Sequence, residues 1–142
     1  MSDIQKDVIF DVQRLPQTKI INHIIPSAVI LNYSSNDEGE PLGKVVSNWL
    51  SNGAVHIASV GENAASTEDA VDWIIVDDDK SDVVTTAHVN ESANEALDFV
   101  MLHMGLNFDT FRVVFVTNMD DEITKEWVGL IAAEKAKKGQ IS

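Results

Sequence analysis

The chain has 142 residues, 44% of them hydrophobic, with 23 acidic and 10 basic side chains and a formal net charge of −13. This length and apolar content suit one domain with a sizeable core, and they exclude a disordered chain or a small cross-linked scaffold. The absence of cysteine excludes disulfides, thiolate catalysis and cysteine-ligated zinc. No segment resembles a signal peptide or approaches the ~20 apolar residues that span a bilayer, so we expect a cytoplasmic protein with no membrane contact.

The acidic excess is concentrated in the middle of the chain. Residues 36–100 hold 14 acidic residues against only Lys44 and Lys80, a net charge of −12, whereas both flanking segments are close to neutral. A field of this sign repels nucleic acid and anionic membranes, attracts basic proteins, and disfavours a large interface between copies of the chain through this segment. The alternative is that the acids serve only solubility.

Strands and helices are predicted to alternate along the chain. Residues 1–27 form an N-terminal segment with a candidate edge strand at 8–12, parallel or antiparallel, and an unassigned element at 19–25. Four βα units then fill residues 28–142. Their strands are predicted from β-branched apolar runs at residues 28–33, 55–59, 83–86 (extending as far as 89) and 112–116.

Apolar residues at helical spacing follow each of these strands. Turn and capping residues mark where the helices begin and end. They are Pro41 and Gly53 for the first helix, Ser66 or Thr67 for the start of the second, Ser92, Glu95 and Gly105 for the third, and Asn118 and Gly139 for the fourth.

The alternation predicts one three-layer αβα domain over residues 1–142, minimal Rossmann-like or flavodoxin-like, with a mainly parallel sheet of four or five strands. Ligands of such sheets bind beyond the carboxyl ends of the strands, here residues 33–39, 59–63, 87–91 and 117–120. The loops in these segments carry too few glycines and too many acids for a phosphate loop, so no nucleotide cofactor is expected.

One histidine lies at this edge, and no motif of a known catalytic class accompanies it. His88 ends the third strand and is a candidate catalytic base or ligand contact, with Thr85 and Thr86 as neighbours; the alternative is a ring bonded to a loop carbonyl. The candidate ligand-binding residues are Ser59, Gly61, Glu62, His88, Asn90 and Asn118. No metal site is expected, because the Asp77–Asp79 run lies at the opposite edge of the sheet and lacks a calcium-loop glycine.

Three tryptophans lie on predicted helices, at or beside the apolar faces. Packing against the sheet is expected for Trp49, Trp73 and Trp127, but Trp73 is also surrounded by acids, a composition typical of a surface that captures a basic protein. The residues of this candidate partner surface are Glu68, Asp69, Asp72, Trp73, Asp77, Asp78 and Asp79.

Two short stretches, EDAVDW (Glu68–Trp73) and TTAH (Thr85–His88), resemble segments of small uncharacterised bacterial αβα proteins. The overall profile is similar to that of immunity proteins, which are small, acidic and catalytically silent inhibitors of basic toxins. The favoured hypothesis is a non-enzymatic binding protein for a basic partner such as a toxin domain. The alternatives are a Rossmann-like ligand-binding or regulatory domain and an enzyme that uses His88; the oligomeric state stays open.

Overall fold

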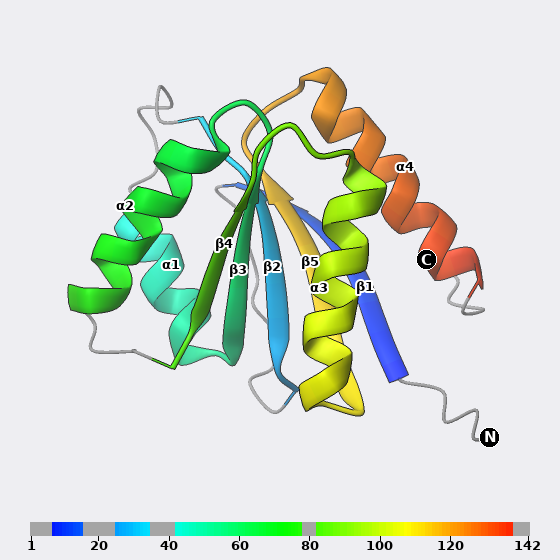
Figure 1. The fold of residues 1–142 in the computed structure, drawn as a ribbon, viewed down its shortest axis with the longest axis horizontal. Helices are drawn as coiled ribbons and strands as arrows, with labels where there is room; N and C mark the ends of the chain where they lie inside the picture. The colour runs from blue at the N-terminus through cyan, green and yellow to red at the C-terminus, as the bar shows by residue number, and fades with distance from the viewer. Residues whose placement is uncertain (1–6, 16–24, 35–41, 78–81, 138–142) are drawn as a thin grey trace.

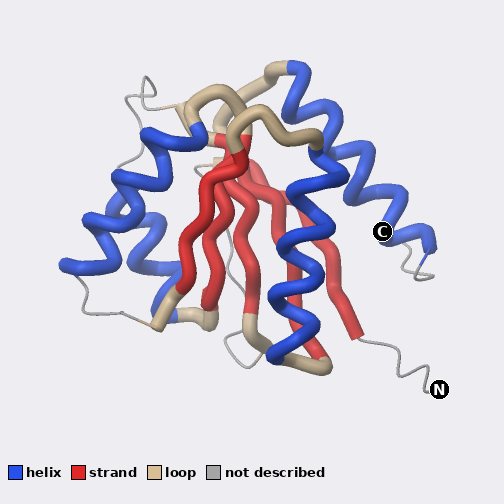
Figure 2. Tube along the Cα trace, in the orientation of Figure 1, coloured by secondary structure: helices blue, strands red, loops and turns tan. Residues whose placement is uncertain are grey.

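The computed structural model describes residues 7–15, 25–34, 42–77 and 82–137 of the chain. Within these ranges, strands and helices alternate after the first strand, as Figures 1 and 2 show. The strands are β1 (Asp7–Arg14), β2 (Ser27–Asn32), β3 (Ala54–Val60), β4 (Val84–His88) and β5 (Thr110–Thr117). The helices are α1 (Leu42–Ser51), α2 (Ala64–Asp77), α3 (Ala93–Asn107) and α4 (Glu122–Lys137).

The five strands form one parallel sheet in the order β1-β5-β2-β3-β4. The N-terminal strand predicted at residues 8–12 is therefore parallel, and it pairs with β5 from Asp7 opposite Thr110 to Arg14 opposite Thr117. β2 is the central strand and each of its residues is buried, which explains its uninterrupted run of small and apolar residues. β1 and β4 are the two edges.

Two helices cover each face of the sheet. α1 and α2 bury Trp49 and Val71 against one face, and α3 and α4 bury Val100 and Trp127 against the other. Phe115 of β5 stacks on Trp127, with the ring centroids 5.5 Å apart. These three layers confirm the predicted αβα class with a parallel sheet (Figure 2). None of the described helices is long and apolar enough to cross a bilayer.

The second helix begins earlier than the sequence predicts. α2 starts at Ala64, so Ser66 and Thr67 lie in its first turn and neither is its cap. The Thr67 amide donates to the Asn63 carbonyl (2.9 Å), which closes that turn. The predictions that involve residues 19–24, Pro41 and Gly139 lie outside the described residues.

The third helix has the predicted start and a later end. Ser92 and Glu95 form the predicted capping box, since each side chain accepts a hydrogen bond from the backbone of the other. Gly105 does not end the helix, because the amide of Phe108 still donates to the carbonyl of Met104 (2.8 Å).

Candidate functional site

The carboxyl edge of the sheet has a topological switch point between β2 and β5, because the helices that follow these two strands lie on opposite faces. Asn32, at the end of β2, is almost fully buried there. Its amide donates to the hydroxyl of Thr124 (3.0 Å) and to the carboxylate of Asp121 (3.1 Å). The Thr117 hydroxyl donates to the Asn32 carbonyl (2.8 Å). The crevice is thus filled by the protein's own polar side chains.

Asp121 fixes the start of the last helix. Its carboxylate accepts a hydrogen bond from the backbone amide of Thr124 (2.9 Å), so α4 begins at Glu122 and not near Asn118. Burial alone would raise the pKa of Asp121, but the hydrogen bonds from Thr124 and Asn32 outweigh it and lower the pKa. Asp121 therefore stays ionised and holds the switch point together.

A pocket of about 300 Å³ opens beside this network, on the face covered by α3 and α4. It lies between the loop after β3, the loop after β4 and the first turns of α4. Four of the six predicted ligand-binding residues line it, namely Gly61, Glu62, His88 and Asn90. Its other lining residues are Val60, Val89, Glu91, Ser92, Ala93, Ala96, Ile123, Glu126 and Trp127.

The other two predicted residues do not join this pocket. Ser59 is fully buried within β3. Asn118 bonds reciprocally with Ser34 across the ends of β5 and β2, its amide donating to the Ser34 carbonyl (2.9 Å) and its oxygen accepting from the Ser34 amide (2.8 Å). The order β5-β2-β3-β4 separates Asn118 from His88 by two strands, a distance that the sequence alone does not reveal.

His88 belongs to a chain of hydrogen bonds. Its Nδ1 lies 3.0 Å from Glu91 Oε1, its Nε2 lies 2.9 Å from Thr86 Oγ1, and that hydroxyl lies 2.9 Å from His56 Nε2. A carboxylate only accepts, so His88 carries its proton on Nδ1, and its Nε2, when the ring is neutral, accepts from Thr86. Thr86 then accepts from His56, which leaves His56 Nδ1 as a buried acceptor without a partner among the described atoms.

Both ring nitrogens of His88 are thus engaged inside the protein, and its side chain is only 4% exposed. A general base needs a nitrogen within reach of its substrate. His88 is therefore better suited to a structural role in the pocket wall than to acid–base catalysis. Thr85, the other expected neighbour, points to the opposite face of the sheet, where its hydroxyl donates to the carboxylate of Asp72. Alternating side chains along a strand explain the difference between Thr85 and Thr86.

His56 is a candidate functional residue that could not be selected from the sequence. It is fully buried, with ring centroids 4.7 Å from His103 and 6.0 Å from Phe99. Burial, with smaller contributions from the charges of His103 and His88, lowers the pKa of His56 to about 4. No local feature of the sequence could have singled it out, because its contact with Thr86 depends on the register of β3 and β4, which pairs His56 with Val84 and places Thr86 two residues further along the same face.

The pocket is acidic. Glu62, Glu91 and Glu126 line it, and no Lys or Arg does so in the part of the chain that the structure describes. This charge suits a cationic or uncharged hydrogen-bonding ligand and opposes a phosphate. In the described ranges, no three His, Asp or Glu side chains converge as a metal site would require.

A second exposed feature is the outer face of α2, the side turned away from the sheet. Trp73 is 73% exposed and Val76 is 70% exposed, whereas Trp49 and Trp127 are buried as predicted. The packing expected for Trp73 is therefore wrong. Helical spacing sets Asp69, Trp73 and Val76 along one side. The exposed Asp72 borders them on the side toward β4, where its carboxylate accepts the hydrogen bond from Thr85. We call Asp69, Asp72, Trp73 and Val76 the α2 surface.

The remaining acids of the predicted partner surface are not exposed beside Trp73 on the outer face, or they lie outside the described residues. Glu68 is half-buried. Asp77 is the last residue of α2, and Asp78 and Asp79 lie outside the described residues. The geometry therefore narrows the candidate surface to the outer face of the helix.

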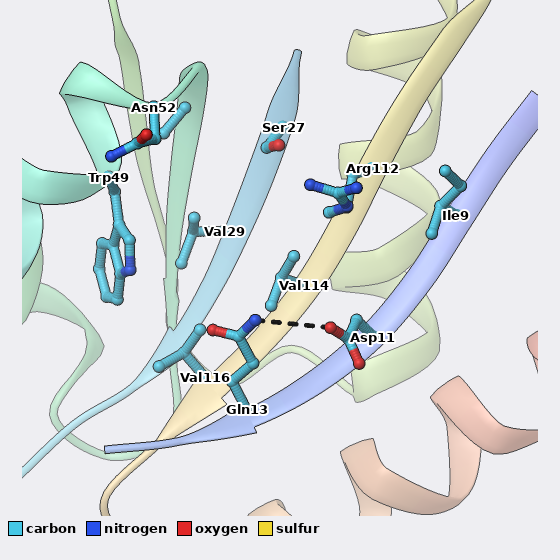
Figure 3. A pocket seen from close by; sticks show the side chains of 11 residues that line it. Ile9, Asp11, Gln13, Ser27, Val29, Trp49, Asn52, Arg112, Val114 and Val116 are labelled. Carbon is cyan, nitrogen blue, oxygen red and sulfur yellow. Dashed lines mark hydrogen bonds between the residues drawn. The ribbon is translucent and has the colours of Figure 1, made fainter. Parts of the chain in front are cut away.

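A smaller pocket, of about 100 Å³, lies in the middle of the sheet on the face of α1 (Figure 3). Trp49 and Arg112 stand on opposite sides of it, and the Gln13 amide reaches the carboxylate of Asp11 (3.4 Å). It extends from Ser27 and Ala54, at the amino ends of β2 and β3, to Gln13 and Val116, one residue before the ends of β1 and β5, and none of the predicted site residues line it.

The fold and these surfaces define a three-layer αβα protein with an acidic pocket at the carboxyl edge of its sheet. The chain belongs to the family Domain of unknown function (DUF7684), whose sequence profile matches residues 8–137. No curated protein and no solved structure matches the chain. The resemblance to an uncharacterised family is thereby confirmed, and the family brings no activity with it.

Proposed function

We propose that this chain is a binding protein that docks a basic protein partner on the α2 surface. The observation that carries the proposal is the exposure of Trp73, at 73%, beside exposed Val76 and two exposed carboxylates. Leaving an indole in water forgoes the burial free energy of a large apolar side chain, and tryptophan is enriched among residues that dominate binding energy.

Charge supports a basic partner. The α2 surface lies in the acidic segment 36–100, and its carboxylates Asp69 and Asp72 flank the indole. Complementary charge raises association rates by roughly 10- to 1,000-fold and excludes partners of the same sign. An apolar anchor bordered by acids therefore favours a basic protein over a nucleic acid or an anionic membrane.

The acidic surface and its apolar anchor also suggest which class of basic protein the partner belongs to. An immunity protein that neutralises a basic toxin in the cytoplasm would need an acidic surface with an apolar anchor and no catalytic group of its own. We propose that class of partner, in a bacterial cell, as the first to test.

Replacing the indole tests the α2 surface directly. We expect Trp73→Ala to weaken binding of a captured basic partner at least ~30-fold, the effect of losing a binding hot spot, because the indole supplies the apolar anchor. Folding stability should change by no more than about 0.5 kcal/mol, since the side chain is exposed. Affinity measured by titration calorimetry, with stability from chemical denaturation, checks both.

The matched control is Val128→Ala, which truncates an exposed apolar residue of α4 (41% exposed). It should bind the partner as the wild type does. Equal affinity of the Trp73→Ala variant and the wild type would show that the partner docks elsewhere.

A second candidate function is the binding of a small cation or amine in the pocket at the carboxyl edge. The observation that favours it is the convergence of Gly61, Glu62, His88 and Asn90 on one pocket with two further glutamates. A ligand at 100 times its dissociation constant should stabilise the fold by about 2.7 kcal/mol. A thermal-shift screen of amines and uncharged polar metabolites tests this; no stabilisation, or equal stabilisation of Glu62→Gln, would count against the pocket.

A further inference from the structure

The smaller pocket, on the α1 face of the sheet, has an apolar floor. The register of β5 and β2 sets Val114 beside Val29, and Val116 follows Val114 on the same face. All three side chains are buried and all three line the pocket. Figure 3 shows Val29 and Val114 between Trp49 and Arg112. A floor of valines offers water no hydrogen bond and favours contact with an apolar chain.

A buried hydrogen-bond donor faces this floor. Trp49 is fully buried, and its indole Nε1 forms no hydrogen bond within the described part of the chain. In Figure 3 this nitrogen is on the edge of the ring turned toward Val29 and Gln13, so the N–H group is directed into the pocket. Buried polar groups nearly always have a partner, and an indole nitrogen can only donate. Nε1 therefore needs an oxygen acceptor inside the pocket.

Arg112 places a positive charge at the other end of the pocket. It is the only Lys or Arg among the described lining residues. Its guanidinium forms no ion pair and no hydrogen bond within the described ranges. Arg112 is half-buried, and Ile9, which pairs with it across β1 and β5, is 37% exposed, so this end of the pocket is the open one. A half-buried guanidinium at an open end suits a carboxylate.

The one acid among the described lining residues lies further along the floor. Asp11 is opposite Val114 in the pairing of β1 and β5, two residues beyond Arg112 along β5. Its carboxylate accepts hydrogen bonds from the backbone amide of Val12 (2.9 Å) and the side-chain amide of Gln13 (3.4 Å). Because Asp11 is engaged by its own strand, the guanidinium stays available to an anion that enters the pocket.

We propose that this pocket binds a small organic acid, with its carboxylate on Arg112, an apolar chain over the valines, and a keto or hydroxyl oxygen that accepts from the indole of Trp49. A cavity of about 150 Å³ holds benzene, so about 100 Å³ with one open end admits a chain of roughly five carbons. The carboxylate stays at the mouth, where it keeps part of its hydration, and the neutral oxygen is buried. The α2 surface contributes no lining residue, so this proposal is independent of the basic partner.

The indole N–H resonances of the ¹⁵N-labelled full chain test this proposal. The probe is 4-oxopentanoate, and pentanoate, which lacks the keto oxygen, is the matched ligand. At concentrations up to about 50 mM, well above the millimolar dissociation constant of a ligand with about eight non-hydrogen atoms, we expect the Trp49 signal to move downfield with 4-oxopentanoate and much less with pentanoate. The signals of Trp73 and Trp127 should stay in place. An unmoved Trp49 signal overturns the proposal.

Substitutions test the two ends separately, with binding followed by backbone amide signals and folding checked by circular dichroism. Arg112→Gln should weaken binding of 4-oxopentanoate at least ~10-fold, through loss of a charge-assisted hydrogen bond. Arg14→Gln, which removes an arginine outside the pocket, should bind as the wild type does. Trp49→Phe keeps a ring without the N–H group, so it should lose the roughly tenfold preference for the oxo acid over pentanoate. Wild-type affinity in Arg112→Gln, or an unchanged preference in Trp49→Phe, overturns the proposal.

Discussion

Gly61→Ala is expected to lower the free energy of unfolding by about 3 kcal/mol, from a strained backbone and a steric clash together. Gly61 has φ +87°, a conformation that costs a residue with a Cβ atom. An added Cβ would lie 2.5 Å from Oδ1 of Asn32. Asn32 cannot move aside without breaking its hydrogen bonds to Asp121 and Thr124. Urea denaturation of both proteins measures the difference.

Gly129→Ala is the matched control. Gly129 lies within α4, and a Cβ added there meets nothing within 4 Å. This variant should gain roughly 0.5–1 kcal/mol, because alanine loses less backbone entropy in a helix than glycine does. If Gly61→Ala were as stable as the wild type, the close approach of the β3–α2 loop to Asn32 would be wrong.

Lowering the pH from 7 to 4.5 should cost the fold about 2.5 kcal/mol through His56 alone, the free energy of the difference in proton binding between the folded and unfolded chains. The pKa of His56 is about 4 in the folded chain against 6.5 for the unperturbed group. Above pH 6.5 the ring is neutral in both states and contributes nothing. Between pH 6.5 and 4 only the unfolded chain takes up the proton, so stability falls as the pH falls.

His56→Leu isolates this contribution, since carboxylates such as Asp121 also respond to acid. The variant should lose about 2.5 kcal/mol less than the wild type between pH 7 and 4.5, because leucine binds no proton. For each protein the loss is measured from its own free energy of unfolding at pH 7. The cost of losing the hydrogen bond between His56 and Thr86 is therefore already included in the value for the variant at pH 7. Parallel pH dependences of the two proteins would mean that His56 titrates normally and is not buried as described.

Most of the fold could be predicted from the sequence, because its signals are local. The β-branched run of β2, the capping box at Ser92 and Glu95, and the apolar spacing of α1 each act within a few residues. The parallel direction of β1 could not be predicted, since it depends on pairing with β5, which lies about a hundred residues away in the chain. The start of α4 was missed because Asn118 bonds to Ser34 and Asp121 supplies the cap.

The candidate site was predicted only in part, because some of its signals are local and others depend on strand order. The rule that ligands bind at the carboxyl edge brought Gly61, Glu62, His88 and Asn90 to one pocket, since their loops follow the adjacent strands β3 and β4. The prediction that Asn118 belongs to this site was wrong, because β2 and β3 lie between β5, which Asn118 follows, and β4. The exposure of Trp73 could not be predicted, because an aromatic residue within a largely apolar helix gives no sign of which way it faces.

The most direct test of a basic partner for the α2 surface is affinity capture from source-cell lysate at low and high salt, with wild type, Trp73→Ala and Asp69→Lys side by side. We predict one basic protein that is retained by the wild type, weakened by salt, and lost in both variants, because binding needs the indole and the acidic field together. Capture of a protein that is indifferent to salt and to both substitutions, or of no basic protein at all, would contradict the proposal.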